Sequence, residues 1–385
     1  MIANISLNLP AVIEFGAGKI NTLSLHLQGC RKIFLLVDKP VFPKIEPLVR
    51  EIESSGKEVF VSTEVVPEPP IDTLSGLLLP VKDFRPDAVV GIGGGSTMDL
   101  AKLVSVLFTG EQQIHEVIGI NNLGKRNIRL VLASTTSGTG SEVTPIAVLT
   151  DTREKLKKGV VSPHLVADVT IVDPELTLGL PAPVTAATGM DAMTHCIEAY
   201  TNRFAHPVID NLALQGIALI AANLETVVSD GGNLEGRTAL ALGSLYGGLC
   251  LGPVNTAAVH ALAYPLGGEF NVPHGVANSV LLPFVMDFNL SKCSGKYAQV
   301  ARAMGVTTRG SDKTTAEEGI QRIKGLSARC GIPKGLKQLA IPESAIPVMA
   351  KAAMLVTRLL DNNPRKVELK DAEAIFRAAF KGAEN

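Results

Sequence analysis

The sequence has no tryptophan and only four tyrosines, and its charges give no surplus of either sign. Lysine and arginine number 36 against 37 aspartates and glutamates, for a formal net charge of −1. Neutralising phosphates takes a basic surplus, and stacking bases takes exposed aromatic rings. The composition therefore argues against a nucleic-acid partner.

Cysteine is also scarce, and the chain contains no CxxC pair. The odd number and wide spacing of the thiols predict reduced, mostly buried side chains of a cytoplasmic protein. The first ten residues lack the basic segment and cleavage site of a signal peptide, so no secretion is expected. The five thiols are Cys30, Cys196, Cys250, Cys293 and Cys330.

Charged side chains are missing from residues 238–268, a stretch long enough to cross a bilayer. Gly247-Gly248 and Gly252-Pro253 interrupt it, however, and His260 lies inside it. Two buried helices joined by a Gly-Pro turn explain this pattern better than a membrane span does. We expect a soluble protein with no membrane partner.

What the sequence does contain is a change in residue pattern near residues 174–182. Before it, short apolar runs alternate with helical stretches, as in an α/β domain with a parallel sheet. After it, long Ala- and Leu-rich helical segments dominate. We predict an α/β domain over residues 1–178 and an all-helical domain over 179–385. The expected strands are 31–38, 58–61, 87–93, 129–133 and 169–173, and the expected helices 46–55, 94–106, 183–201, 208–228, 234–251 and 256–267.

A glycine loop, Gly-Ile-Gly-Gly-Gly-Ser-Thr-Met-Asp at residues 91–99, joins an expected strand to an expected helix. Glycines let the backbone approach a ligand, and the helix N-terminus attracts a pyrophosphate. Ser96 is expected to cap that helix, with Asp99 completing the cap. A tight structural turn is the alternative explanation.

Asp38 ends an expected strand before the glycines. An acid there can bind a ribose 2′-hydroxyl and would repel a 2′-phosphate, which favours NAD over NADP. It could equally be an ordinary loop acid. A second run of small residues, Ser-Thr-Thr-Ser-Gly-Thr-Gly-Ser-Glu at 134–142, is open to a phosphate or ribose contact or to a plain polar loop.

Asp191 and His195 are spaced i, i+4 in a helical segment, so both project from one face and could chelate one divalent ion. A simple Asp–His hydrogen bond is the alternative. His260 lies in the charge-free stretch, where an imidazole needs a partner, and His274 lies in a turn context between Pro273 and Gly275. Together these residues would give one oxygen and three nitrogen ligands and leave coordination positions open on iron or zinc.

These motifs resemble those of the iron-containing, metal-dependent alcohol dehydrogenases across essentially the whole chain. The matching segments are residues 93–99, 135–144, 187–195 and 273–278. The resemblance implies the fold shared with dehydroquinate synthase: a Rossmann-like N-terminal domain, an all-α C-terminal domain, and a catalytic cleft between them. It also implies a homodimer or higher homo-oligomer.

The resemblance implies roles for particular residues as well. Asp191, His195, His260 and His274 would bind the metal, Fe²⁺ or Zn²⁺. Tyr264 stands where members typically carry a second histidine in an HxxxH pattern, which leaves open whether it bonds to the substrate or only packs. The residues implied to contact NAD are Asp38, Gly94, Gly95, Ser96, Asp99, Thr135, Thr136, Thr139 and Lys157.

The expected function is hydride transfer between NAD(H) and a small alcohol or its aldehyde or ketone. The metal would act as a Lewis acid on the substrate oxygen. Glycerol dehydrogenase-like, dehydroquinate synthase-like and maleylacetate reductase-like activities remain alternatives on the same fold. A non-catalytic metal or nucleotide binder is the alternative from another class.

Overall fold

The computed structural model describes residues 3–382 except 155 and 309. The chain forms two compact units. The α/β unit comprises residues 7–136 and 140–178, and the helical unit comprises residues 3–6, 137–139 and 179–382. This division into a parallel-sheet part and a helical part confirms the fold class expected from the sequence.

The α/β unit is built on a six-stranded parallel sheet in the order β1-β9-β6-β4-β2-β3. The strands are rich in β-branched and apolar residues because both faces of the sheet are covered. The bounds of the six strands are β1 Val12–Phe15, β2 Lys32–Val37, β3 Glu58–Ser62, β4 Ala88–Gly93, β6 Arg129–Ser134 and β9 Val169–Val172.

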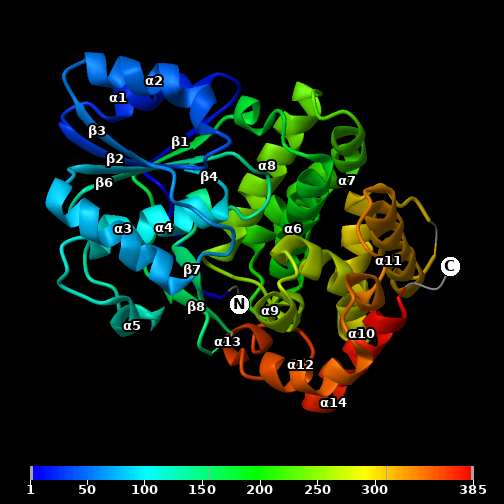
Figure 1. Ribbon diagram of the computed structural model, residues 1–385. Helices are drawn as coiled ribbons and strands as arrows, with labels where there is room; N and C mark the ends of the chain where they lie inside the picture. Colours follow the sequence, from blue (N-terminus) through cyan, green and yellow to red (C-terminus); the bar gives the residue numbers. More distant parts are fainter. Residues whose placement is uncertain (1–2, 155, 309, 383–385) are drawn as a thin grey trace. The chain divides into compact units, whose positions relative to one another are not determined.

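Alternate residues of each strand pack on opposite layers of helices (Figure 1). Phe34 and Leu36 of β2 face the layer formed by α3 and α4, whereas Ile33 and Leu35 face the layer formed by α1 and α2. The bounds of the helices of this unit are α1 Leu23–His26, α2 Phe42–Ser54, α3 Ile71–Phe84, α4 Gly95–Leu107 and α5 Ile114–Val117.

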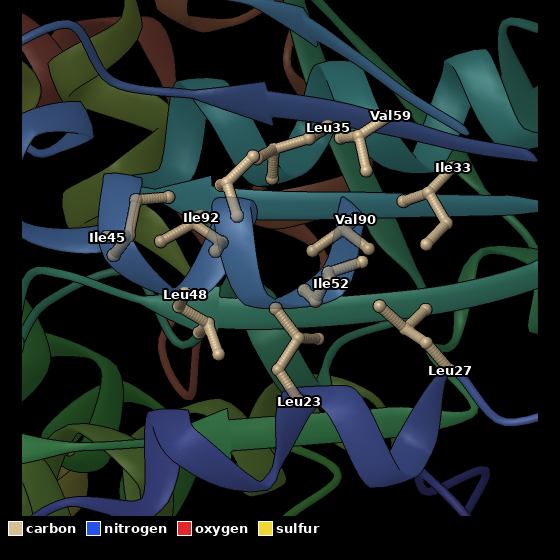
Figure 2. Close-up of a pocket in the computed structure, with 11 residues that line it drawn as sticks. Leu23, Leu27, Ile33, Leu35, Ile45, Leu48, Ile52, Val59, Val90 and Ile92 are labelled. Atoms are coloured by element: carbon tan, nitrogen blue, oxygen red, sulfur yellow. The ribbon is translucent and has the colours of Figure 1, made fainter. Parts of the chain in front are cut away.

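Figure 2 shows the layer between α1, α2 and the sheet, where aliphatic side chains including Leu23, Leu48, Val90 and Ile92 surround a cavity of about 10 Å³. This volume is about that of one water probe, and the lining offers no hydrogen-bond partner. The cavity is a small packing defect rather than a ligand site.

The sequence did not predict a second, smaller sheet in the α/β unit, in the order β5-β8-β7. Its hairpin carries charged residues such as Lys157 and Lys158, which obscure the strand pattern. The individual elements β1, α1, α3 and α5, and the helices beyond residue 270, were not predicted either. The bounds of the small sheet are β5 Gly119–Ile120, β7 Ile146–Asp151 and β8 Leu156–Val161.

The helical unit surrounds α6, most of which is buried against α7, α8 and α10 (Figure 1). Its helices are α6 Ala182–Thr201, α7 Pro207–Ser229, α8 Leu234–Leu251, α9 Ala258–Phe270, α10 His274–Ala303, α11 Asp312–Arg329, α12 Ile346–Ala353, α13 Thr357–Leu360 and α14 Leu369–Lys381. Short 3₁₀ turns connect elements in both units at Lys19–Thr22, Ser141–Val143, Pro163–Leu165, Pro174–Thr177, Leu336–Leu339 and Glu343–Ala345.

The charge-free stretch forms most of α8, a break at Gly252-Pro253, and most of α9, as two predominantly buried helices. Among the described residues, only α7 is long and apolar enough to span a membrane. One such helix is weak evidence, because a core helix passes the same test, and α7 packs along α6 and α8. The five cysteines, all within the described part of the chain, are unpaired and buried, as the sequence predicted.

Candidate metal and nucleotide sites

Three helices of the helical unit, α6, α9 and α10 (Figure 1), carry the predicted metal ligands. Asp191 and His195 lie one turn apart on the same face of α6. His260 is the third residue of α9, and His274 is the first residue of α10. His274 therefore opens a 30-residue helix rather than lying in an isolated turn, and Pro273 at the N-cap fixes where that helix starts.

The four side chains converge on one point. Asp191 Oδ1 lies 3.9 Å from His195 Nε2, 3.6 Å from His260 Nε2 and 4.0 Å from His274 Nε2. Two ligands bound to one ion at about 2.1 Å lie roughly 3 to 3.5 Å apart, so a small closure would complete the set. One carboxylate oxygen and three imidazole nitrogens are donors that suit Fe²⁺ or Zn²⁺.

Hydrogen bonds on the far side of two imidazoles aim their Nε2 atoms at this point. His195 Nδ1 lies 3.2 Å from the carbonyl oxygen of Gly138, and His260 Nδ1 lies 2.5 Å from Glu198 Oε2. An Nδ1–H donated to such an acceptor leaves Nε2 as the nitrogen that can bind a metal. Glu198 was not among the residues predicted from the sequence, although its spacing of seven residues from Asp191 places both on one face of α6.

Burial and charge act in opposite directions at these groups. Burial lowers the pKa of His195. Burial also disfavours the charged form of His260, but Glu198 and Asp191 outweigh it and raise the pKa of His260 to about 9. Burial opposes ionisation of Asp191, yet the three imidazoles hold its pKa below the usual range. The Asp191 and Glu198 carboxylates thus favour a positive charge on the neighbouring imidazoles, and a bound metal ion would take the place of an imidazole proton.

Of the four predicted ligands, His274 is the most accessible. Its side chain is 26% exposed, whereas those of Asp191, His195 and His260 are 4 to 5% exposed. Tyr264 lies on this accessible side, one turn after His260 on α9, with its ring centroid 6.4 Å from that of His274.

The glycine loop lies at the carboxyl end of β4, beside the end of β2. After β2 the chain adds β3 on one side of the β2–β4 pair, whereas after β4 it adds β6 on the opposite side. This is the topological switch point, where open α/β sheets bind their ligands. Asp38, directly after β2, accepts a hydrogen bond from Gly94 N at 2.9 Å and another from the Thr97 hydroxyl.

The predicted cap of α4 by Ser96 and Asp99 is wrong. The helix begins at Gly95 with Gly94 as its N-cap, and no side chain caps it. The Asp38 carboxylate takes the Gly94 N–H instead, while Ser96 Oγ accepts from Glu68 N at 3.1 Å. A long-range contact thus replaced the local motif.

Several other predicted cofactor residues lie around the same loop. Thr135 N donates to the carbonyl oxygen of Gly93 at 3.0 Å, and the Thr136 side chain lies against Gly94. Lys157 Nζ lies 3.4 Å from Oε2 of Glu68, which also contacts Ser96 through its backbone. Thr139 belongs to the short segment 137–139 grouped with the helical unit.

Asp99 is engaged inside the α/β unit. Its carboxylate accepts from Ser141 Oγ at 2.5 Å and from Val148 N at 2.9 Å, and it lies 3.7 Å from the buried Lys102 ammonium. These contacts tie α4 to β7 and to the Ser141–Val143 turn. Asp99 therefore links three segments of the α/β unit through its carboxylate.

Comparison with known proteins gives matches over nearly the whole chain. Residues 10–174 match the family model described as "Iron-containing alcohol dehydrogenase", and residues 185–380 match "Fe-containing alcohol dehydrogenase family, C-terminal". Long-chain-alcohol dehydrogenase 1 of Geobacillus thermodenitrificans (strain NG80-2) is 38% identical over 382 residues, covering 97% of this chain and 96% of the relative.

Solved structures of related enzymes also match the chain over nearly its whole length. A crystal structure of 1,3-propanediol oxidoreductase matches with a TM-score of 0.94 and 38% identity, covering 98% of this chain and 100% of the other. Sulfoacetaldehyde reductase from Bifidobacterium kashiwanohense, solved in complex with NAD⁺, matches with a TM-score of 0.87 and 26% identity, covering 98% of each chain. These matches do not favour the alternative activities considered from the sequence.

Proposed function

The chain belongs to the iron-containing alcohol dehydrogenase family and is an NAD-dependent oxidoreductase, and on this premise we propose that it interconverts a small alcohol and its aldehyde at the Asp191, His195, His260 and His274 site. The observation that supports this most strongly is that one carboxylate oxygen and three imidazole nitrogens lie close enough to bind a single ion. The Nε2 atoms of the three histidines are 3.6 to 4.0 Å from Asp191 Oδ1.

The donor set fits a divalent iron or zinc ion, with positions left open for a substrate oxygen. When bound, such an ion supplies Lewis acidity, which lowers the pKa of a hydroxyl group and polarises a carbonyl. Asp191 supplies the negative charge of the site. Glu198 and the Gly138 carbonyl hold two of the imidazoles in the orientation that presents Nε2.

We place the substrate on the accessible side of the site, next to His274 and Tyr264. The Tyr264 hydroxyl would hydrogen-bond to the substrate oxygen, a role that fits its neutral charge and its position one turn after His260. On this proposal Tyr264→Phe lowers kcat/KM without changing the metal content.

The nucleotide would bind at the switch point of the α/β unit. When bound, NAD would supply the hydride acceptor, and the protein's part would be to bind and orient it. The backbone of Gly94 and Gly95 at the N-terminus of α4 suits the pyrophosphate, and Asp38 suits the ribose. Residues 7–136 and 140–178 would thus form the dinucleotide-binding domain, and residues 3–6, 137–139 and 179–382 the metal-binding domain.

We also propose a homodimer in the cytoplasm. Strand β1 is an edge of the six-stranded sheet, and its Val12 and Ile13 are 38% and 36% exposed, with Leu9 just before it at 45%. An exposed apolar edge is a template for pairing with a second copy. The five unpaired thiols are consistent with a reducing compartment.

Metal analysis and NADH formation on anaerobically purified protein test the proposed activity. Wild-type protein should form NADH with short alcohols, lose this activity to a chelator and regain it with Fe²⁺ or Zn²⁺. His260→Ala should lose metal and turnover together, whereas His115→Ala, at an exposed position on α5, should keep both. Turnover that persists in metal-free protein, or in His260→Ala, would refute the assignment.

A further inference from the structure

Asn278 lies in the middle of the proposed metal site, although it is not one of the four ligands. It is on α10, one turn after His274, and is fully buried. Its Nδ2 atom lies 2.7 Å from Asp191 Oδ1, 3.0 Å from His260 Nε2 and 3.1 Å from His274 Nε2. The amide nitrogen is therefore at hydrogen-bond distance from three of the four ligand atoms.

The contact with Asp191 sets the direction of the amide. An ionised carboxylate oxygen can only accept a hydrogen bond, so the group that faces it at 2.7 Å must be the NH₂ and not the carbonyl. The partly positive hydrogens of that NH₂ point to the place where the ligand atoms converge. The NH₂ group thus presents partial positive charge to the ligand atoms, as a bound cation would.

The other end of the amide is in an unfavourable position. The Oδ1 atom of Asn278 is buried and has no hydrogen-bond partner among the described residues. A buried acceptor without a partner destabilises the folded protein. If the carboxamide were reversed beside a bound cation, this oxygen would gain a partner, and the NH₂ group would no longer face the ion.

We propose that the Asn278 carboxamide reverses with the occupancy of the site, donating through Nδ2 to the ligands when the site is empty and turning Oδ1 toward the metal when it is filled. The inference rests on the proposed metal site. A cation repels the NH₂ hydrogens and occupies the lone pairs to which they would bond. A half-turn about the last side-chain bond places the carbonyl oxygen, a hard donor, against the ion.

The reversal requires little repacking. The terminal torsion of asparagine is broad and nearly two-fold, and its oxygen and NH₂ group are similar in size. On reversal the Oδ1 atom, which lacks a hydrogen-bond partner among the described residues, gains the ion as its partner. Asn278 is thus a positioning residue that raises metal affinity.

Two variants and a matched control test this proposal through metal binding rather than turnover. Asn278→Leu keeps the approximate volume but can neither donate nor accept, and Asn278→Asp keeps an oxygen but cannot donate. Asn289→Leu is the control, because Asn289 is also buried on α10 but pairs with Asn363 at 2.9 and 2.8 Å, away from the ligands. The full-length protein is titrated with Co²⁺ against a competing chelator, and Tm is measured with and without the metal.

Asn278→Leu should weaken Co²⁺ binding by roughly 10- to 100-fold, the range seen when groups that support a metal site are removed. The rise in Tm on adding Co²⁺ should shrink accordingly. Asn278→Asp should have a lower Tm than wild type without metal, because two carboxylates then face each other, and a larger rise with it. Asn289→Leu should lower Tm equally in both states and leave the affinity unchanged.

Wild-type or tighter Co²⁺ binding in Asn278→Leu would overturn the proposal, since the amide would then only compete with the metal. A smaller metal-induced rise in Asn278→Asp than in wild type would overturn it as well. His260→Ala, measured in parallel, separates the two levels of inference. If His260→Ala still binds Co²⁺ as wild type does, the proposed metal site itself is wrong. If His260→Ala loses Co²⁺ and Asn278→Leu does not, only the role of Asn278 fails.

Discussion

The Nδ1 atom of His260 lies 2.5 Å from Oε2 of Glu198, and both side chains are buried. The other carboxylate oxygen, Oε1, accepts from Val259 N at 2.6 Å. One carboxylate on α6 therefore fixes both the start of α9 and the orientation of the imidazole that α9 carries. Through this pair, the helix that supplies two predicted ligands also positions a third.

Glu198→Gln should weaken metal binding by about tenfold. Glutamine has a single acceptor oxygen, so it cannot accept from both Val259 N and His260 Nδ1, and it lacks the charge that stabilises the imidazole. Metal titration against a chelator measures the effect. Thermal unfolding of the metal-free variant shows whether stability alone has changed, and unaltered affinity would contradict the positioning role.

Gly275→Ala should destabilise the protein by about 1 to 3 kcal/mol and weaken metal binding. A Cβ at this position would lie 2.5 Å from the backbone oxygen of Ala187 on α6, so α10 would have to shift and carry His274 with it. Gly295→Ala is the control on the same helix. Its Cβ would make only an ordinary contact at 3.6 Å, and the loss of a helical glycine should stabilise it slightly. Urea unfolding of the two variants should give shifts of opposite sign.

Asp38→Ala should raise the NADP-to-NAD ratio of kcat/KM by roughly tenfold or more, about 1.4 kcal/mol of changed preference. Removing the carboxylate removes its repulsion of a 2′-phosphate. It also leaves Gly94 N and the Thr97 hydroxyl without their partner, so activity with NAD should fall at the same time. Steady-state kinetics with both cofactors checks this, and an unchanged ratio would argue against the ribose contact.

Glu142→Gln should flatten the dependence of stability on pH between about pH 5 and pH 7. Burial raises the pKa of Glu142 to about 7 from its ordinary 4.5. The folded state therefore binds the proton more tightly than the unfolded state does. The resulting stability is fully present below about pH 4.5 and is lost as pH rises through about 7.

The loss expected in the wild type is on the order of 1 to 3 kcal/mol. Denaturant unfolding at several pH values measures it, with the exposed Glu175→Gln as control. An equal pH slope in wild type and Glu142→Gln would show that the nearby Lys102 and Asp99 charges, and not Glu142, set the dependence.

Much of the fold was predictable because its signals are local. Apolar runs such as residues 32–37 and 88–93 mark buried parallel strands, and helices α6 to α9 follow from long Ala- and Leu-rich segments. The β7–β8 hairpin was not predicted, because Lys157 and Lys158 interrupt the apolar pattern. The cap of α4 was assigned wrongly because a distant side chain, Asp38, competed with the local motif.

The fold class and the family follow from the sequence, which also predicts the ligand-bearing residues, since motif spacing and the period of apolar residues are local features of the chain. Only the tertiary structure decided which groups hold those residues in place. Glu198, Gly138 and Asn278 contact predicted ligands as far as 57 to 87 residues away, although Asn278 also contacts His260, 18 residues away, and His274, one turn before it. Such contacts depend on how helices pack, and no short-range pattern encodes them.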